Sequence, residues 1–287
     1  MEAPRRPTTV PNVLRPGLYL VATPIGNLRD ITLRALDILA GVDLILCEDT
    51  RTGGKLLAAH GIKGKLARYD EYAGERVRPK VLRRLADGGK VALISDAGTP
   101  LVSDPGYRLV REAVDQGSAV YAAPGPSAVL AALTVSGLPS DRFLFAGFPP
   151  PKAAGRLALF AELAPVRATL IFYESGPRLA ASLADMAQVL GAREAVVARE
   201  LTKLHETVLR GRLGDLAADP RLASPRGEIV VLVSPCLDPI ATLDEADAAL
   251  LEAVARVGPA RAASEVARAL GLSRRELYAR ALALRGQ

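Results

Sequence analysis

The stretch from Val91 to Gly106 constrains the fold of this chain more than any other. Four consecutive apolar residues, Val91 to Ile94, run directly into a segment rich in Ser, Asp, Gly and Pro. A short unbroken apolar run is typical of a strand buried on both faces, as in a parallel sheet. The abrupt change indicates a loop at the carboxyl end of that strand, where open α/β sheets bind ligands. An ordinary strand-to-helix turn uses the same residue types, so the residues alone leave both interpretations open.

Strands and helices alternate on both sides of this stretch. After a flexible lead-in over residues 1–15, we expect strands at 17–22, 42–47, 65–68, 91–94 and 118–122, and helices at 33–40, 51–60, 75–87 and 107–116. This alternation predicts a parallel α/β domain over residues 16–123. Asp30 or Thr32 is expected to cap the first helix.

A second α/β block follows the interruption at Pro124–Ser127, which gives a second predicted domain over residues 124–237. Its expected strands are 143–146, 169–173, 195–198, 206–210 and 228–233, and its expected helices are 156–163 and 178–190. No long helix separates the last two strands. We therefore expect them to pair antiparallel, which would make the second sheet mixed.

Residues 240–287 form a third predicted domain, rich in Ala, Leu, Arg and Glu. Thr242 is expected to cap a helix over 243–257, and two further helices flank a turn at Gly271–Ser273, which is the pattern of a helix-turn-helix. Arg274, Arg275 and Arg280 lie on the last helix and suit contacts to phosphates. A small helical cap or dimerisation element remains the alternative.

Composition narrows the functional class. The 287 residues are 49% hydrophobic and 24% charged, with a formal net charge of +6, which permits but does not require a polyanionic partner. Two Cys and two His, widely scattered, give no disulfide framework and no metal-ligand spacing. No stretch is typical of a signal peptide or a membrane span, so the expected location is the cytoplasm.

Polar clusters fall at several predicted strand ends, where they would share one rim of a cleft. These clusters are Thr23–Asn27, Glu48–Arg51, Ser95–Asp104, Glu174–Gly176 and Arg199–Lys203. The sequence has no Ser-His-Asp order, no phosphate-binding Walker loop and no G-x-G-x-x-G fingerprint, which disfavours a hydrolase or a conventional dinucleotide enzyme. The residues alone predict a two-domain α/β protein with a cleft and a basic helical tail, and they do not name the ligand.

Six segments together resemble the ribosomal RNA small-subunit methyltransferase I family, a branch of the tetrapyrrole methylase superfamily. The segments are Thr23–Thr32, Cys47–Arg51, Ser95–Gly106, Pro124–Ala128, Phe172–Ser175 and Arg199–Glu206, in chain order. The resemblance implies a two-domain class III methyltransferase fold with a helical tail, a homodimer, S-adenosylmethionine in the cleft, and 2′-O-methylation of a cytidine ribose in small-subunit ribosomal RNA. One departure is Glu174-Ser-Gly-Pro-Arg178, where relatives usually have Glu-Ser-Pro-His-Arg.

The resemblance also implies which residues bind the cofactor. It places beside it residues from the first-strand turn, the central loop, the second cofactor loop and the second domain: Pro24, Ser95, Asp96, Gly98, Leu101, Val102, Ser127, Ala128, Glu174 and Leu201. No metal is implied.

The expected chemistry is one in-line displacement in which the protein mainly aligns the attacking oxygen. Glu48 and Asp49 are candidates for a general base, and Lys203 and Arg51 for placing or neutralising phosphate. Two rivals remain: a methylase of a tetrapyrrole or of a protein side chain with the same fold, and a helix-turn-helix binding protein whose α/β body senses a small molecule.

Overall fold

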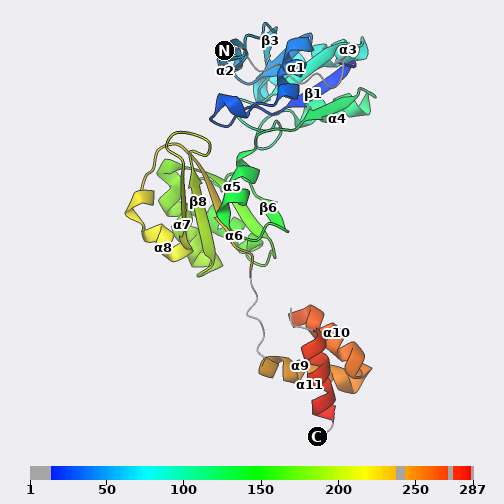
Figure 1. Ribbon diagram of the computed structural model, residues 1–287, viewed down its shortest axis with the longest axis vertical. Helices are drawn as coiled ribbons and strands as arrows, with labels where there is room; N and C mark the ends of the chain where they lie inside the picture. Colours follow the sequence, from blue (N-terminus) through cyan, green and yellow to red (C-terminus); the bar gives the residue numbers. More distant parts are fainter. Residues whose placement is uncertain (1–13, 237–242, 271–273, 286–287) are drawn as a thin grey trace, which may run out of the picture. The chain divides into compact units, whose positions relative to one another are not determined.

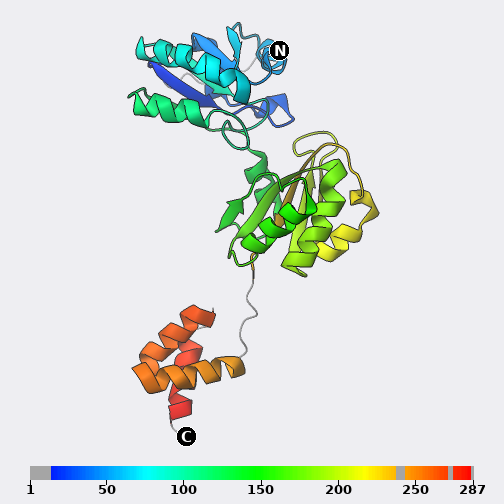
Figure 2. The same ribbon diagram turned by 180° about the vertical axis from the view of Figure 1, so that it is seen from behind.

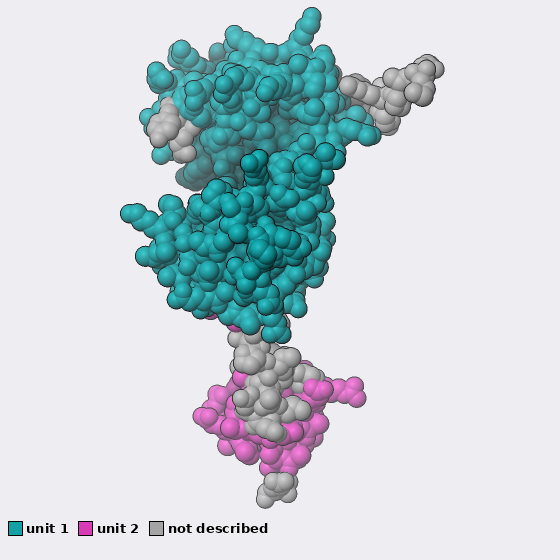
Figure 3. All heavy atoms as spheres, turned by 90° about the vertical axis from the view of Figure 1, so that its left-hand side faces the viewer, with its two compact units in different colours: residues 1–163, 169–234 teal, residues 164–168, 235–287 magenta. Residues whose placement is uncertain are grey.

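The computed structural model describes residues 14–236, 243–270 and 274–285. The chain divides into two compact units, Met1–Leu163 with Thr169–Ser234, and Ala164–Ala168 with Pro235–Gln287 (Figure 3). In the described residues the first unit holds two β-sheets with their helices, and the second holds the helical tail.

The first sheet is entirely parallel and has the strand order β3-β2-β4-β1-β5. Its strands are β1 (Gly17–Val21), β2 (Leu44–Cys47), β3 (Leu66–Arg68), β4 (Lys90–Ile94) and β5 (Val120–Ala123). The central position of β4 explains why Val91 to Ile94 are all buried. Because parallel strands end at the same edge, the loops after β1, β2, β4 and β5 meet there.

Two pairs of helices cover the two faces of this sheet (Figures 1 and 2). On one face α1 (Leu33–Gly41) and α2 (Thr50–Ala59) pack against strand residues such as Ile45. On the other face, α3 (Glu71–Ala86) and α4 (Tyr107–Asp115) pack against strand residues such as Leu93. The cap of α1 is Thr32, whose hydroxyl accepts a hydrogen bond from the backbone N–H of Ala35 at 3.1 Å. The predicted parallel α/β architecture is therefore confirmed.

The second sheet is mixed and has the strand order β6-β7-β10-β8-β9. Its strands are β6 (Phe143–Phe145), β7 (Thr169–Ser175), β8 (Glu194–Arg199), β9 (Thr207–Arg212) and β10 (Glu228–Val233). β6 and β7 pair in parallel and the other neighbours pair antiparallel. The prediction of a mixed sheet is confirmed, but the expected pairing of the last two strands is wrong, because β8 lies between β9 and β10. The periodicity of a strand identifies its buried faces and not its partners.

Helices also cover both faces of the second sheet. α5 (Ala128–Ser136) packs on one face through Val129, Ala132 and Leu133. α6 (Ala153–Leu163) packs on the other, where the rings of Phe160 and Phe172 meet edge to face with centroids 5.5 Å apart. α7 (Gly176–Leu190) packs beside α6, and α8 (Leu213–Ala218) packs beside α7.

The tail consists of α9 (Leu243–Val257), α10 (Pro259–Leu270) and α11 (Arg274–Arg285), which enclose a small apolar core that includes Leu250 and Leu277. Thr242, the expected cap, and the turn at Gly271–Ser273 lie outside the described residues. The domain boundaries at 16–123, 124–237 and 240–287 stay predictions. Within the described residues, the helices are all too short or too polar to cross a membrane.

Candidate active site

Three loops at the carboxyl edge of the first sheet are joined by hydrogen bonds. Thr23, after β1, exchanges two backbone hydrogen bonds with Gly98, at 2.9 and 3.0 Å. The hydroxyl of Thr23 donates to the carbonyl of Ser95 at 3.1 Å, and that of Thr99 donates to the carbonyl of Pro126 at 3.0 Å. The loop after β4 is thus fixed to the loops after β1 and β5.

Four residues other than glycine have a left-handed backbone conformation near this edge. Leu101 and Ser103 have φ of 73° and 63° in the loop after β4, and Glu200 and Thr202 have φ of 52° and 67° in the loop between β8 and β9. Such conformations are sterically unfavourable for residues other than glycine and cluster at functional sites. We therefore regard both loops as shaped for binding.

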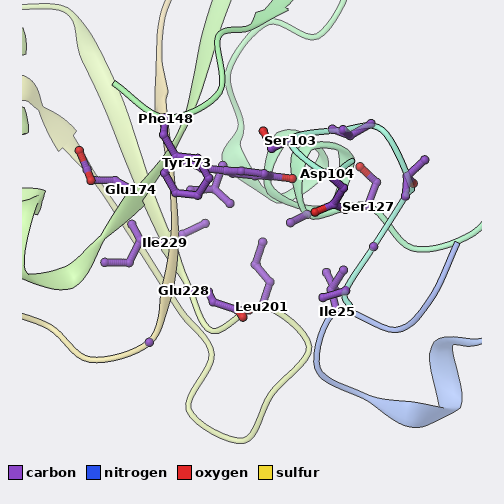
Figure 4. Close-up of a pocket in the computed structure, with 18 of the residues that line it drawn as sticks. Ile25, Ser103, Asp104, Ser127, Phe148, Tyr173, Glu174, Leu201, Glu228 and Ile229 are labelled. Atoms are coloured by element: carbon purple, nitrogen blue, oxygen red, sulfur yellow. The ribbon is translucent and has the colours of Figure 1, made fainter. Parts of the chain in front are cut away.

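A cavity of about 330 Å³ lies between these loops and the second sheet (Figure 4). Its lining is mostly apolar, including Ile25, Val102, Ala128, Leu201 and Ile229. The carboxylate-bearing residues along it are Asp104, Glu174 and Glu228, and none of the described residues that line it is Lys, Arg or His. The cavity is therefore suited to a partly apolar ligand with positive charge, and not to a phosphate.

Six of the ten residues predicted to bind the cofactor line this cavity: Gly98, Val102, Ser127, Ala128, Glu174 and Leu201. Pro24, Ser95 and Asp96 instead line a second cavity of about 140 Å³. Leu101 lines neither and packs with the apolar cluster under α3 and α4. Ser127 also caps α5, since its hydroxyl accepts from the N–H of Leu130.

The carboxylate of Glu174 points away from the large cavity (Figure 4). It accepts hydrogen bonds from the hydroxyl of Ser182 and from the N–H of Ser175, and it lies 3.4 Å from Nε of Arg178. The side chain is fully buried. We therefore assign the carboxylate to holding the start of α7, which leaves the backbone of this residue to face the cavity.

Asp49 caps α2 and is bound by Arg51. Its Oδ1 accepts from the N–H of Arg51 at 2.8 Å, and its Oδ2 lies 2.7 Å from Nη2 of the same residue. The hydrogen bonds from Arg51 lower the pKa of Asp49 to about 2. A carboxylate with so low a pKa is a weak base near neutral pH.

Glu48 has the opposite environment. Burial, followed by the charges of Asp104 and Asp96, raises the pKa of Glu48 to about 7. Burial likewise raises the pKa of Asp104 to about 6, and the two carboxyl groups are hydrogen-bonded to each other. The pair therefore exchanges a proton with solvent near neutral pH.

Lys203 bridges two carboxylates. Its Nζ lies 2.8 Å from Oε1 of Glu200 and 3.0 Å from Oε2 of Glu228, and its stem packs over Gly26. Burial alone would lower the pKa of Lys203, but the hydrogen bonds to the two glutamates outweigh it and raise the pKa. Lys203 is thus a permanent cation that ties the loop between β8 and β9 to the start of β10 and to the loop after β1.

The predicted RNA-binding arginines differ in their surroundings. Arg51 is exposed but paired with Asp49. Arg274 and Arg275 are exposed at the start of α11, whereas Arg280 is paired with Asp247 on α9. The roles assigned to these arginines, to the cofactor residues and to Glu48, Asp49 and Lys203 stay predictions.

Sequence reasoning missed several cavity residues, namely Asp104, Phe148, Tyr173 and Glu228. The ring of Tyr173 lies between those of Phe145 and Phe148, with centroids 4.7 and 5.4 Å away, and extends toward Asp104 (Figure 4). Asp104 belongs to the loop that the sequence singled out, so its position was the available signal. Phe148 and Glu228 carried none, because they lie far along the chain from the recognised segments.

Comparisons with known proteins show the family of this chain. The model of the family Tetrapyrrole (Corrin/Porphyrin) Methylases matches residues 17–217, and that of the RsmI C-terminal HTH domain matches residues 241–285. The ribosomal RNA small subunit methyltransferase I of Mesorhizobium japonicum is 51% identical over 99% of this chain and 95% of its own length. The protein of that name from Erythrobacter litoralis is 53% identical over 95% of this chain and 96% of its own length.

Solved structures share the fold at low identity. The uroporphyrin-III-C-methyltransferase of Thermus thermophilus has a TM-score of 0.54 and 22% identity, over 77% of this chain and 94% of its own. A diphthine synthase has a TM-score of 0.58 and 15% identity, over 76% of this chain and 89% of its own. The chain therefore belongs to the tetrapyrrole methylases, in the family of ribosomal RNA small subunit methyltransferase I.

Proposed function

We propose that this protein transfers a methyl group from S-adenosylmethionine to the ribose 2′-hydroxyl of a cytidine in small-subunit ribosomal RNA. The observation that carries the proposal is the likeness to relatives of that name along nearly the whole chain, tail included. The reaction would take place in the cytoplasm, and a homodimer would carry it out.

The large cavity fits S-adenosylmethionine. Its apolar walls suit an adenosine moiety, and Asp104 supplies negative charge for a positively charged group, whereas the Glu228 carboxylate is paired with Lys203. The absence of Lys, Arg and His among the described residues of its lining fits a cofactor without phosphates. When bound, the cofactor supplies an electrophilic methyl group on a positively charged sulfur.

The residues of the chain then have to hold the ligands in place and remove a proton. The loops after β1, β4 and β5 are joined by hydrogen bonds, so they present one rigid wall. Rigid alignment of the reacting groups is itself a large contribution to such a displacement. Contacts to RNA phosphates would come from exposed arginines such as Arg274 and Arg275, which lie on the tail.

The experiment that tests this function is methyl transfer from tritium-labelled S-adenosylmethionine. The purified chain is incubated with small ribosomal subunits that lack the modification and, separately, with protein-free ribosomal RNA. We expect label in a cytidine ribose after nuclease digestion. Label in protein or in an added tetrapyrrole would favour the rival methylases, and no transfer with tight cofactor binding would favour a ligand sensor.

A further inference from the structure

Asp104 stands between two cavities. One is the large cavity described above, and the other is a separate cavity of about 150 Å³ beside α3 and α4. Among the described residues that line either cavity, Asp104 is the one common to both. The other residues of the smaller cavity are Tyr69, Asp70, Gly74, Arg78, Pro105, Gly106, Tyr107 and Arg108.

The two cavities differ in the charged side chains that line them. The smaller one carries two arginines, Arg78 and Arg108, beside the aspartates Asp70 and Asp104, whereas the described lining of the large one has no arginine. Tyr107, which lines the smaller cavity, is 66% exposed. Exposed aromatic rings stack on unpaired bases, and guanidinium groups bind phosphates. The smaller cavity therefore suits an anionic nucleotide, whereas the large one suits a cationic cofactor.

Arg108 is available to an incoming phosphate at little cost. Arg108 pairs with Glu75 at 3.3 Å, and both side chains are 68% exposed. Such a surface pair contributes little to stability, so a phosphate replaces the carboxylate readily. Arg78 is more enclosed, and its Nε lies 2.8 Å from Oε1 of Glu112.

Asp104 is surrounded by groups that govern its proton. Glu48 donates to or accepts from it, the hydroxyl of Ser95 contacts it, and the charge of Asp96 opposes its ionisation. Burial, and then the charge of Asp104, raise the pKa of Tyr173 on β7. On the other side it faces the smaller cavity, whose titratable groups are Tyr69, Asp70, Arg78, Tyr107 and Arg108.

We propose that the smaller cavity receives the target nucleotide and that Asp104 accepts the proton of its 2′-hydroxyl. This inference rests on the proposed function. In the step, the O–H bond of the hydroxyl breaks and the proton passes to the Asp104 carboxylate. The freed electron pair of the oxygen forms the bond to the methyl carbon, while the carbon–sulfur bond breaks and its pair stays on sulfur as a neutral thioether.

Glu48 has a positioning role in this scheme. Burial raises the pKa of both carboxyl groups, and Glu48 is the hydrogen-bond partner of Asp104. It thereby orients the Asp104 carboxylate through their hydrogen bond. As the two groups are coupled, the pair titrates in two steps that belong to both residues.

The test is single-turnover methylation of small ribosomal subunits at saturating tritium-labelled cofactor, followed between pH 5 and pH 9. For Asp104→Asn we expect a loss of about 100-fold or more, the range of general acid–base catalysis, and loss of the acid limb of the pH profile. For Glu48→Gln we expect the limb to persist as a single step. Asp87→Asn, an exposed carboxylate at the end of α3, is the matched control and should behave as the unaltered protein.

Nucleotide binding is tested with Arg108→Gln and Tyr107→Ala. Each should raise the subunit concentration for half-maximal rate by about 5-fold or more, as expected for one lost phosphate or stacking contact, with unchanged affinity for the cofactor. Unchanged half-saturation in both would overturn the assignment of the smaller cavity.

The outcomes separate the two proposals. If the unaltered chain transfers no label, the proposed function fails and this inference fails with it. If the unaltered chain is active and Asp104→Asn keeps its rate and pH limb, only this inference fails. Loss of the limb in Glu48→Gln but not in Asp104→Asn would make Glu48 the proton acceptor instead.

Discussion

Arg280 on α11 makes a bidentate contact with Asp247 on α9: Nε lies 2.6 Å from Oδ1 and Nη2 lies 2.8 Å from Oδ2. This two-point geometry is the strongest that an arginine makes with a carboxylate. It distinguishes Arg280 from Arg274 and Arg275, although all three looked alike as candidates for RNA contacts. We infer that Arg280 primarily holds the tail together.

The first prediction concerns the stability of the tail. The pair with Arg280 lowers the pKa of Asp247, so its stabilising effect is fully present above the ordinary pKa of an aspartate. The effect is lost as pH falls through the lowered value. Asp247→Asn should therefore speed amide hydrogen exchange in α9 and α11 at pH 7, and the difference from the unaltered chain should vanish in strong acid. An equal difference at all pH values would contradict this account.

The second prediction concerns the exposed arginines. The double variant Arg274→Gln with Arg275→Gln should weaken binding to small subunits and reduce the salt slope of log K by about 1 to 2, or about 0.7 to 0.9 per lost phosphate contact. The melting temperature and the affinity for the cofactor should not change. An unchanged salt slope would remove the start of α11 from the RNA interface.

The third prediction concerns Gly176, where the chain departs from the usual motif. A Cβ added there would overlap the backbone carbonyl of Pro225, which no side-chain rotation relieves. Gly176→Ala should therefore destabilise the protein by about 1–3 kcal/mol, the usual cost of overpacking. Gly214, in α8, has nothing within 4 Å of the added carbon and no positive φ. Gly214→Ala should instead stabilise by about 0.4–1 kcal/mol, and thermal melting of the two variants provides a matched comparison.

The fourth prediction concerns the stability cost of Asp104. Burial raises its pKa to about 6, above the ordinary value near 3.8. A raised carboxyl pKa disfavours the folded state, and the penalty grows as pH rises through the unfolded value and reaches its limit above the folded one. Asp104→Asn should thus melt about 2 °C or more above the unaltered chain at pH 8, with a smaller gap at pH 4. A lower melting temperature at pH 8 would show that the carboxylate is stabilising.

The fifth prediction concerns Asp96. Its Oδ1 accepts a hydrogen bond from the N–H of Asp49 at 3.2 Å, and its charge raises the pKa of both Glu48 and Asp104. Asp96 lines the second cavity, but the residues that follow it, such as Ala97 and Gly98, line the large one. Asp96→Ala should therefore weaken cofactor binding, measured by calorimetry, before it disturbs folding, and should lower the pKa of the two neighbours. Asp96→Asn, which keeps a hydrogen-bond acceptor, separates the effect of charge from that of the lost contact. Normal cofactor affinity in both variants would remove Asp96 from the binding site.

The sequence predicted the features that local chemistry decides. Val91 to Ile94 are apolar because β4 is buried on both faces, and Thr32 caps α1 because its hydroxyl reaches a free N–H. The loop that follows β4 could be placed at the edge of the sheet for the same reason. Segment identity and strand ends were therefore within reach.

What the sequence could not provide depends on contacts between distant segments. Nothing in β9 or β10 reveals that β8 separates them, because pairing is decided by the whole sheet. The Glu174 carboxylate points toward Ser182 on α7, and the residues of its own strand, β7, do not indicate that direction. Asp104 is a candidate proton acceptor because it lines two cavities, and only the folded structure reveals both.

The left-handed residues Leu101, Ser103, Glu200 and Thr202 have a thermodynamic consequence. Each such conformation costs of order 1–3 kcal/mol, and here it is imposed by folding. A ligand that enters the cavity then finds walls whose shape is already set, and it loses less affinity to the ordering of loops. The free protein is therefore less stable than it would be without these four conformations, and a bound ligand raises the free energy of unfolding again by mass action.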